Sequence, residues 1–250
     1  YANFRLIKAD IREGLPDLAV DEIYNLACPA SPPNYQRDPV GIMRTNILGA
    51  LHVLEYGREH GARILQASTS EVYGDPDVHP QPESYLGAVN FTGPRACYDE
   101  GKRAAETLCY DYHRQYAVEI RVPRLFNTYG PGMRAGDGRV VPNFVTQALL
   151  SEALTLYGAG SQTRSFCFVS DMVDALIALM NAPGDRIGPI NLGNPAELSV
   201  RDLAHRIIAL TRSRSALTYL PLPEDDPKVR RPDIAKAHTV LGWQPKVDLD

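Results

Sequence analysis

Short apolar segments alternate with longer polar and apolar stretches along the first half of the chain. Such segments, four to eight residues long, have the length and the near-continuous hydrophobicity of strands buried on both faces. We expect strands at residues 5–11 (RLIKADI), 22–27 (EIYNLA), 63–69 (RILQAST) and 119–125 (EIRVPRL).

Two of the intervening stretches have a helical period. In residues 39–61, Ile47, Leu51 and Leu54 recur on one face, and residues 97–116 form a second amphipathic helix. Strands separated by helices are typical of βαβ units, whose parallel sheet is covered on both faces. The pattern therefore predicts an α/β fold.

The pattern of the sequence changes after residue 126, where a loop rich in Gly and Pro is followed by shorter predicted helices and strands. Ser199 and Asp202 resemble a capping box before a further helix, and Asp171 suits the first turn of another. We expect a first domain at 1–128, to which 165–182 returns, and a smaller lobe formed by 129–164 and 183–250.

Composition excludes several classes of protein. The 250 residues are 44% hydrophobic and 22% charged, with a net charge of −4, so we expect no nucleic-acid partner. The four cysteines are scattered without a CxxC pair, which argues against a metal site and favours a reduced, cytoplasmic chain. No apolar run approaches the ~18 residues of a membrane helix, so we expect no membrane contact in the visible segment.

Tyr98 and Lys102 are the first candidates for chemistry. They are four residues apart on a predicted helix, so both side chains leave the same face. A nearby ammonium stabilises a phenolate and lowers the tyrosine pKa, which makes a general base for a substrate hydroxyl. Taken alone, the pair is more often a solvated surface pair. Thr69 ends a predicted strand, where ligands bind in parallel sheets, although its hydroxyl could also satisfy loop backbone.

Several longer motifs point in the same direction. The chain resembles the extended short-chain dehydrogenase/reductase family, and within it most closely the UDP-glucuronate decarboxylases, over essentially all 250 residues. This resemblance implies a Rossmann-type doubly wound parallel sheet with a smaller α/β substrate-binding lobe. The motifs that carry it are NLACPASPP (25–33), STSEVYGD (68–75), YDEGKRAAE (98–106), RLFNTYGPGM (124–133), DGRVVPNF (137–144) and DDPKVRRPDI (225–234).

The resemblance implies bound NAD and decarboxylation of UDP-glucuronate to UDP-xylose. Tyr98, helped by Thr69 and Lys102, would take the proton of the C4 hydroxyl while hydride passes to NAD⁺. The resulting β-keto acid loses CO₂, and the C4 ketone is then reduced again. Related dehydratases carry Asp before the glutamate, whereas this chain has Ser70-Glu71. The resemblance pairs Glu71 with Arg230, which would either neutralise the substrate carboxylate or order Glu71.

Further residues match binding positions of the family, although each alone could be an ordinary structural or surface residue. The resemblance also implies a homodimer formed through residues 42–58 and 97–116, which could instead simply pack on the sheet. The implied cofactor-binding residues are Asp10, Ile11, Ala27, Cys28, Asn46, Tyr98 and Lys102. The implied residues for the UDP-sugar substrate are Ser70, Asn127, Arg139, Tyr157, Arg164 and Arg230.

The glycine-rich dinucleotide loop of this family is missing from the sequence. Neither GxGxxG nor GxxGxxG occurs in a strand-turn-helix context, and we expect about 50 to 60 residues of a first βαβ unit to be absent. Two alternatives stay open: another sugar-nucleotide enzyme of the extended family, such as a 4-epimerase or 4,6-dehydratase, or a catalytically silent truncated module that binds sugar nucleotides.

Overall fold

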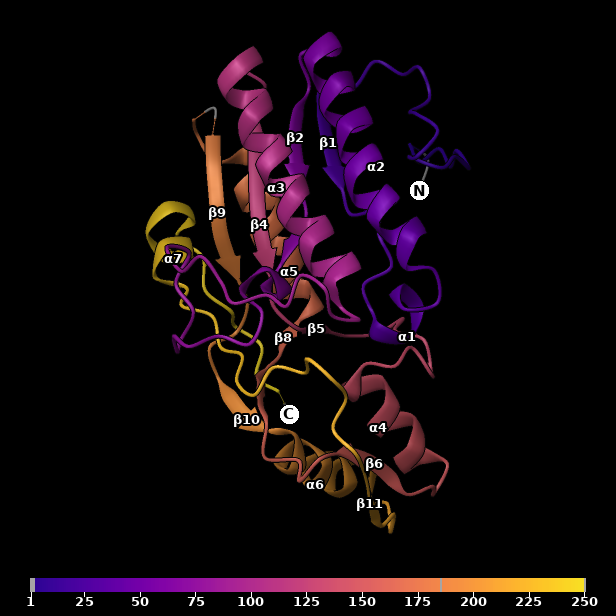
Figure 1. Cartoon of the computed structure of the whole chain (residues 1–250). Helices are drawn as coiled ribbons and strands as arrows, with labels where there is room; N and C mark the ends of the chain where they lie inside the picture. Colours follow the sequence, from indigo (N-terminus) through magenta and orange to yellow (C-terminus); the bar gives the residue numbers. More distant parts are fainter. Residues whose placement is uncertain (1–2, 185, 250) are drawn as a thin grey trace.

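The large sheet has five strands, all paired in parallel (Figure 1). The computed structural model describes residues 3–184 and 186–249. β2 pairs with β1 on one side and with β4 on the other, and β4 also pairs with β3 and β9. The strands are β1 (Glu22–Asn25), β2 (Arg63–Gln66), β3 (Ser68–Thr69), β4 (Ile120–Leu125) and β9 (Arg186–Leu192).

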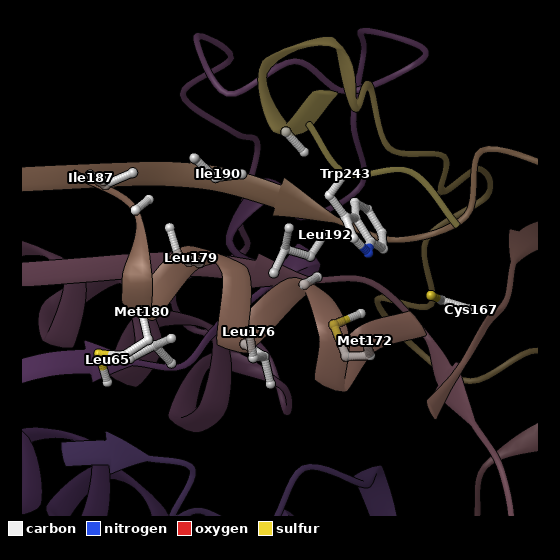
Figure 2. Packing of buried hydrophobic residues seen from close by; sticks show 13 residues of the cluster. Leu65, Cys167, Met172, Leu176, Leu179, Met180, Ile187, Ile190, Leu192 and Trp243 are labelled. Atoms are coloured by element: carbon white, nitrogen blue, oxygen red, sulfur yellow. The ribbon is translucent and has the colours of Figure 1, made fainter. Parts of the chain in front are cut away.

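Helices cover both faces of this sheet (Figure 1). Ile64 packs with Val53 and Leu54 of the helix on one face, whereas the next residue, Leu65, lies beside Met180 on the other (Figure 2). This alternation follows from the period of two in a strand. Figure 2 shows the second face, with Leu65 beside Met180 and with Leu176 and Met172 farther along α5. The helices are α2 (Pro39–His60) and α3 (Ala96–Tyr116) on the first face and α5 (Val169–Asn181) on the second. The predicted α/β fold class is confirmed.

The smaller lobe encloses its own apolar core. Phe144, Leu156 and Leu203 are buried together there. The Ser199 side chain accepts a hydrogen bond from the Asp202 backbone N–H, which confirms the predicted helix start. Its elements are α4 (Val140–Leu149), α6 (Val200–Thr211), the parallel pair β6 (Leu154–Tyr157) and β11 (Leu217–Leu220), and the antiparallel pair β7 (Thr163–Ser165) and β10 (Glu197–Ser199). The short strands β5 (Thr128–Tyr129) and β8 (Cys167–Phe168) pair in parallel between this lobe and the large sheet.

The strand expected at residues 5–11 is not formed, so this prediction is wrong. No described strand pairs with this segment, and Phe4 and Leu6 are 71% and 82% exposed. An extended apolar segment needs a partner for its backbone groups. Instead, Ile11 packs closely against Gly49 of α2, and its carbonyl lies 2.7 Å from the His52 ring nitrogen Nδ1.

The chain stays with the large sheet beyond residue 182, where the sequence predicted that it would enter the smaller lobe. β9 lies within residues 183–250, which were expected in the smaller lobe, but it pairs with β4. Helix α7 (Ala235–Leu241) packs on β9, where Lys236 Nζ donates to the Pro189 carbonyl at 2.8 Å. The Trp243 ring then covers α5, and its Nε1 donates to the Asp171 carbonyl at 3.1 Å (Figure 2). Among the described residues, no helix is both long and apolar enough to span a bilayer.

Candidate active site

A cavity of about 590 Å³ lies between the large sheet and the smaller lobe. Its walls come from the segments that follow β2 and β4, from the start of α3, and from α4 and β6. This is the carboxyl edge of the parallel strands, where open α/β sheets bind their ligands. The cavity is therefore the candidate active site.

Most of the residues singled out from the sequence line this cavity. They come from elements far apart in the chain, and the fold brings them together. The lining residues among the candidates are Cys28, Thr69, Ser70, Glu71, Tyr98, Lys102, Asn127, Arg139, Tyr157, Arg164 and Arg230. The candidates that do not line it are Asp10, Ile11, Ala27 and Asn46.

Tyr98 and Lys102 project from α3 into the cavity, and both are buried. Lys102 Nζ donates to the Ala67 carbonyl at 2.8 Å and lies 5.8 Å from the centroid of the Tyr98 ring. Thr69, at the end of β3, hydrogen-bonds with Tyr98 through its side chain. A phenol, a hydroxyl and an ammonium thus lie together in the lining of the cavity, and these groups can take part in proton transfer.

The pKa of Tyr98 is raised in this structure, contrary to the lowering that we predicted. Burial is the largest cause, with contributions from Cys28 and Glu71, while Thr69 and Arg139 act in the opposite direction. Burial also lowers the pKa of Lys102. The prediction failed because it considered the ammonium but not the removal of the phenol from water.

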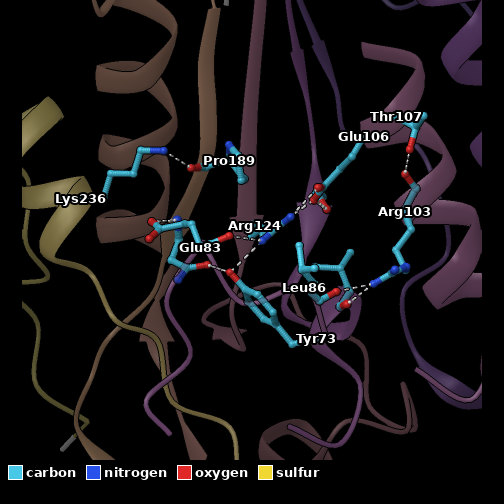
Figure 3. Close-up of polar contacts among 12 residues, drawn as sticks. Tyr73, Glu83, Leu86, Arg103, Glu106, Thr107, Arg124, Pro189 and Lys236 are labelled. Carbon is cyan, nitrogen blue, oxygen red and sulfur yellow. Dashed lines mark hydrogen bonds and ion pairs between the residues drawn. The ribbon is translucent and has the colours of Figure 1, made fainter. Parts of the chain in front are cut away.

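A buried ion pair holds the strand ends in register with α3. Arg124 of β4 donates to both carboxylate oxygens of Glu106 at 2.9 and 2.8 Å, and to the Tyr73 hydroxyl at 3.0 Å (Figure 3). Ser68 donates to the same carboxylate at 2.5 Å. Since Glu106 lies one helical turn after Lys102, this network aligns the face of α3 that carries Tyr98 and Lys102 with Thr69.

A short 3-10 helix, η1 (Ser70–Tyr73), turns the chain away from the strand end. The Thr69 side chain caps it by accepting from the Glu71 backbone N–H at 3.2 Å. Arg103 of α3 donates to the carbonyls of Val72 and Leu86 at 3.0 and 2.9 Å (Figure 3). These contacts hold η1 on α3 and leave the Glu71 side chain facing the cavity.

Glu71 is held by two arginines. Arg230 donates to both carboxylate oxygens at 2.7 and 2.8 Å, and Arg95 donates to Oε2 at 2.8 Å. Burial alone would raise the pKa of Glu71, but the charges and hydrogen bonds of Arg230 and Arg95 lower it to about 2. The carboxylate is therefore ionised at neutral pH.

Sequence reasoning missed two members of this network. Arg95 also lies 3.5 Å from the Asp226 carboxylate, which in turn accepts from Arg164 at 3.0 Å. Arg95 stands three residues before Tyr98, and Asp226 stands four before Arg230. Their spacing from recognised site residues is the one signal that could have found them.

Tyr35 of α1 (Pro32–Tyr35) was also missed. Its ring stacks on the Tyr98 ring, with centroids 5.2 Å apart and planes 7° from parallel. The Tyr35 hydroxyl is buried and has no hydrogen-bond partner among the described residues. The stacked pair fixes the plane of the Tyr98 ring, a role that the sequence PPNY does not reveal.

The residues predicted to bind the cofactor, apart from Tyr98 and Lys102, fall into two groups, one at the cavity wall and one away from it. Asn46 is buried, and its amide donates to Cys28 Sγ at 3.4 Å, so it supports the cavity wall from behind. Asp10 is exposed and accepts a 2.9 Å hydrogen bond from the Arg12 backbone N–H. Ala27 is exposed beside β1, and Ile11 lies on α2.

The cofactor candidates that line the cavity fit the nicotinamide end of a dinucleotide. The Tyr98 hydroxyl and the Lys102 ammonium line the cavity beside Cys28, where they suit the ribose hydroxyls next to a nicotinamide ring. A dinucleotide pyrophosphate normally binds at a glycine-rich turn, which this sequence does not contain. Within the part of the chain that the structure describes, no group of three or more His, Cys, Asp or Glu is placed to hold a metal ion.

Comparison with known proteins places this site in a family. The model of the NAD dependent epimerase/dehydratase family matches residues 5–193. The chain is 55% identical to UDP-glucuronic acid decarboxylase 1 of Danio rerio over 250 residues, which are 100% of this chain and 59% of that protein. It is also 55% identical to UDP-glucuronic acid decarboxylase 5 of Arabidopsis thaliana over 249 residues, which are 100% of this chain and 72% of that protein.

Solved structures share the fold. An epimerase of Methanothermobacter thermautotrophicus superposes with a TM-score of 0.90 at 29% identity, covering 100% of this chain and 76% of that one. The UDP-glucuronic acid 4-epimerase of Bacillus cereus, in complex with UDP-glucuronic acid and NAD, gives 0.83 at 27% identity, covering 92% and 72%. The chain belongs to the NAD dependent epimerase/dehydratase family, which lies within the extended short-chain dehydrogenases/reductases.

Proposed function

We propose that this chain decarboxylates UDP-glucuronate to UDP-xylose, with NAD as its cofactor. One observation carries the proposal: the buried Glu71–Arg230 pair stands beside Tyr98 and Ser70 in one cavity. The names and the 55% identity of the curated relatives support it.

Tyr98 is the proposed general base for the C4 hydroxyl. NAD, when bound, accepts the hydride of C4 and later returns it. Tyr98 can take the hydroxyl proton only as a phenolate, which burial disfavours. Lys102 is the cation placed to stabilise that phenolate, and the Ala67 carbonyl holds its ammonium in position. The Thr69 hydroxyl is placed to hold the same sugar oxygen.

Carbon dioxide leaves after C4 has become a ketone. The C5–C6 bond breaks, and its electron pair moves through C5 onto the C4 oxygen as an enolate. A proton from water then adds to C5. Hydride addition to C4, with return of the Tyr98 proton to the C4 oxygen, gives the xylose. The protonated Tyr98 hydroxyl can donate a hydrogen bond to the enolate oxygen. No hydroxyl departs in this sequence, so the buried Ser70 suffices where a dehydratase needs an acid.

Arg230 had two possible roles, and its geometry favours one of them. Both of its terminal nitrogens bond Glu71, so we propose that Arg230 orders this carboxylate within the cavity. A guanidinium used in this way has fewer donors left for the carboxylate of the sugar.

The side chains that we propose to bind the UDP part of the substrate come mainly from the smaller lobe. Arg164 is buried and points into the cavity, and burial lowers its pKa to about 10, so it remains cationic at neutral pH. Arg139 and Tyr157 line the same region and are partly exposed. Arginine forks suit a diphosphate because they bond two oxygens at once. Asn127, which follows β4, completes this wall.

A homodimer and a cytoplasmic location are further parts of the proposal. Helices α2 and α3 lie side by side on the outer face of the sheet (Figure 1), and the resemblance uses these helices for dimerisation. The four cysteines are free thiols in the described structure, which suits a reducing compartment.

Epimerisation at C4 is the second candidate. The solved Bacillus cereus enzyme acts on UDP-glucuronic acid as an epimerase, and the Tyr98–Lys102 geometry would serve that reaction too. Product analysis after incubation with UDP-glucuronate and NAD⁺ separates the two. UDP-xylose supports decarboxylation, UDP-galacturonate supports epimerisation, and the absence of any product supports the silent sugar-nucleotide-binding module.

A further inference from the structure

Asp99 is a buried carboxyl group that the proposed reaction does not use. It follows Tyr98 in the first turn of α3, and it is only 6% exposed. Its Oδ1 atom has no hydrogen-bond partner among the described residues. Most buried carboxylates are paired with a cation, so an unpartnered oxygen needs an explanation.

Asp99 faces a second, smaller cavity of about 90 Å³ on the far side of Glu71. Glu71 lines both this cavity and the main one, so it stands between Asp99 and the proposed substrate site. Because Asp99 and Glu71 line the same small cavity, the charge of Asp99 interacts with Glu71 and with the arginines that bind it.

In the ion pairs around Glu71, the arginines outnumber the carboxylates. Arg95, Arg164 and Arg230 are linked through ion pairs to two carboxylates, Glu71 and Asp226, which leaves one net positive charge. Asp75 and Asp225 line the same small cavity, and Asp75 pairs with Lys228 at 3.5 Å, so an ionised Asp99 would add one more negative charge beside these arginines. The titratable and charged groups that face Asp99 are Glu71, Arg95 and Arg230, Glu100 on its own helix, Tyr35 on α1, and Asp75 and Asp225 across the small cavity.

We propose that Asp99 is a positioning residue held as a neutral carboxylic acid, so that the arginine cluster around Glu71 stays positive toward an acidic sugar nucleotide. The chemical class of the ligand rests on the proposed function; the neutral state of Asp99 does not. The pKa of Asp99 agrees with a neutral carboxylic acid. Burial, and after it the charge of Glu71, raises this pKa to about 8, while Arg95 and Arg230 act to lower it.

Binding of an acidic sugar nucleotide should therefore depend on pH. As the pH rises through about 8, Asp99 ionises and adds a negative charge beside the arginine cluster. The affinity for UDP-glucuronate should then fall about tenfold, within the usual range of couplings between sites. UDP-glucose has the same diphosphate and no sugar carboxylate, so its affinity should change much less.

The first measurement is a titration of the full chain labelled with ¹³C at the aspartate carboxyl carbons. The Asp99→Asn variant, which is neutral at every pH, assigns the resonance of Asp99 by its loss. We expect that resonance to titrate with a midpoint near 8. A midpoint in the ordinary range of aspartate, near 4, would overturn the proposal whatever the chain catalyses.

The second measurement is calorimetric binding of UDP-glucuronate and of UDP-glucose between pH 7 and pH 9.5. The ratio of the two affinities should fall with pH in the wild type and stay constant in Asp99→Asn. A constant ratio in the wild type would overturn the electrostatic role, even if Asp99 titrates near 8. Because this test reads binding, a failure to release CO₂ would contradict the proposed function and leave the result for Asp99 intact.

Discussion

The Glu71 carboxylate and the Arg230 guanidinium form a two-point ion pair, with N–O distances of 2.7 and 2.8 Å, across 159 positions of the sequence. Arg230 reaches Glu71 from the segment after β11, and both side chains are largely buried. A buried pair of this kind ties the second half of the chain to the strand end that carries Thr69. The pair therefore couples the stability of the site to its proposed chemistry.

Removing the Glu71 charge should destabilise the protein. Glu71→Gln leaves Arg230 and Arg95 without their shared carboxylate, and breaking a buried pair in this way costs about 3 to 5 kcal/mol. Chemical denaturation at pH 7 measures the change in the free energy of unfolding. Arg214→Ala, at an exposed position outside the cavity lining, is the matched control and should stay within about 0.5 kcal/mol of the wild type. A Glu71→Gln variant as stable as this control would show that the pair contributes nothing.

The same pair predicts a loss of stability in acid. The pKa of Glu71 is lowered from its ordinary 4.5 to about 2 in the folded protein. A lowered carboxyl pKa means that its stabilising effect is complete above about pH 4.5 and disappears as the pH falls toward 2. Unfolding free energies measured across this window should fall more steeply for the wild type than for Glu71→Gln. Parallel curves would contradict the assigned pKa.

Tyr98→Phe should abolish turnover without loss of the fold. The phenylalanine keeps the stacking on Tyr35 but removes the oxygen that accepts the sugar proton. A drop in kcat of at least about a thousandfold is expected for a lost general base. Tyr35→Phe is a close control, since the Tyr35 hydroxyl has no partner among the described residues. It should keep its activity and be equally or slightly more stable. Wild-type turnover by Tyr98→Phe would remove the mechanism.

Lys102→Met should shift the pH dependence of the reaction toward higher pH. Burial already raises the pKa of Tyr98, and Lys102 Nζ lies 5.8 Å from its ring centroid, so we expect the loss of this cation to raise the pKa further. We expect kcat at pH 7 to fall about a hundredfold and part of that loss to be recovered at higher pH. Steady-state profiles from pH 6 to pH 10 measure this. A uniform loss across the profile would mean that Lys102 acts only by holding the Ala67 carbonyl.

Much of the fold could be predicted because its pattern is local. The buried strands and the helices between them have clear periods, and each lies within a few residues of its predicted position. The segment 5–11 has the same apolar character, but a strand also needs a neighbour, and hydrophobicity alone does not supply one. The pairing of β9 with β4 is equally invisible, because pairing joins residues about 66 positions apart, as Ile120 and Arg186 are.

The residues of the candidate site also divide into those that the sequence could predict and those that it could not. Tyr98 and Lys102 were found by their spacing and Thr69 by its place at a predicted strand end, whereas the other site residues were found through the family resemblance. Arg95, Asp226 and Tyr35 act through buried contacts with residues distant in sequence, and singly they look like surface or loop residues. The direction of the Tyr98 pKa also depends on burial, which a motif does not report.

Real-time NMR of UDP-glucuronate labelled with ¹³C at C6, incubated with the full chain and NAD⁺, tests the central claim most directly. Decarboxylation predicts that the C6 carboxylate signal disappears as ¹³CO₂ and bicarbonate appear in equal amount, with UDP-xylose as the nucleotide product. Retention of the label in a carboxylate, with UDP-galacturonate formed instead, would contradict the account.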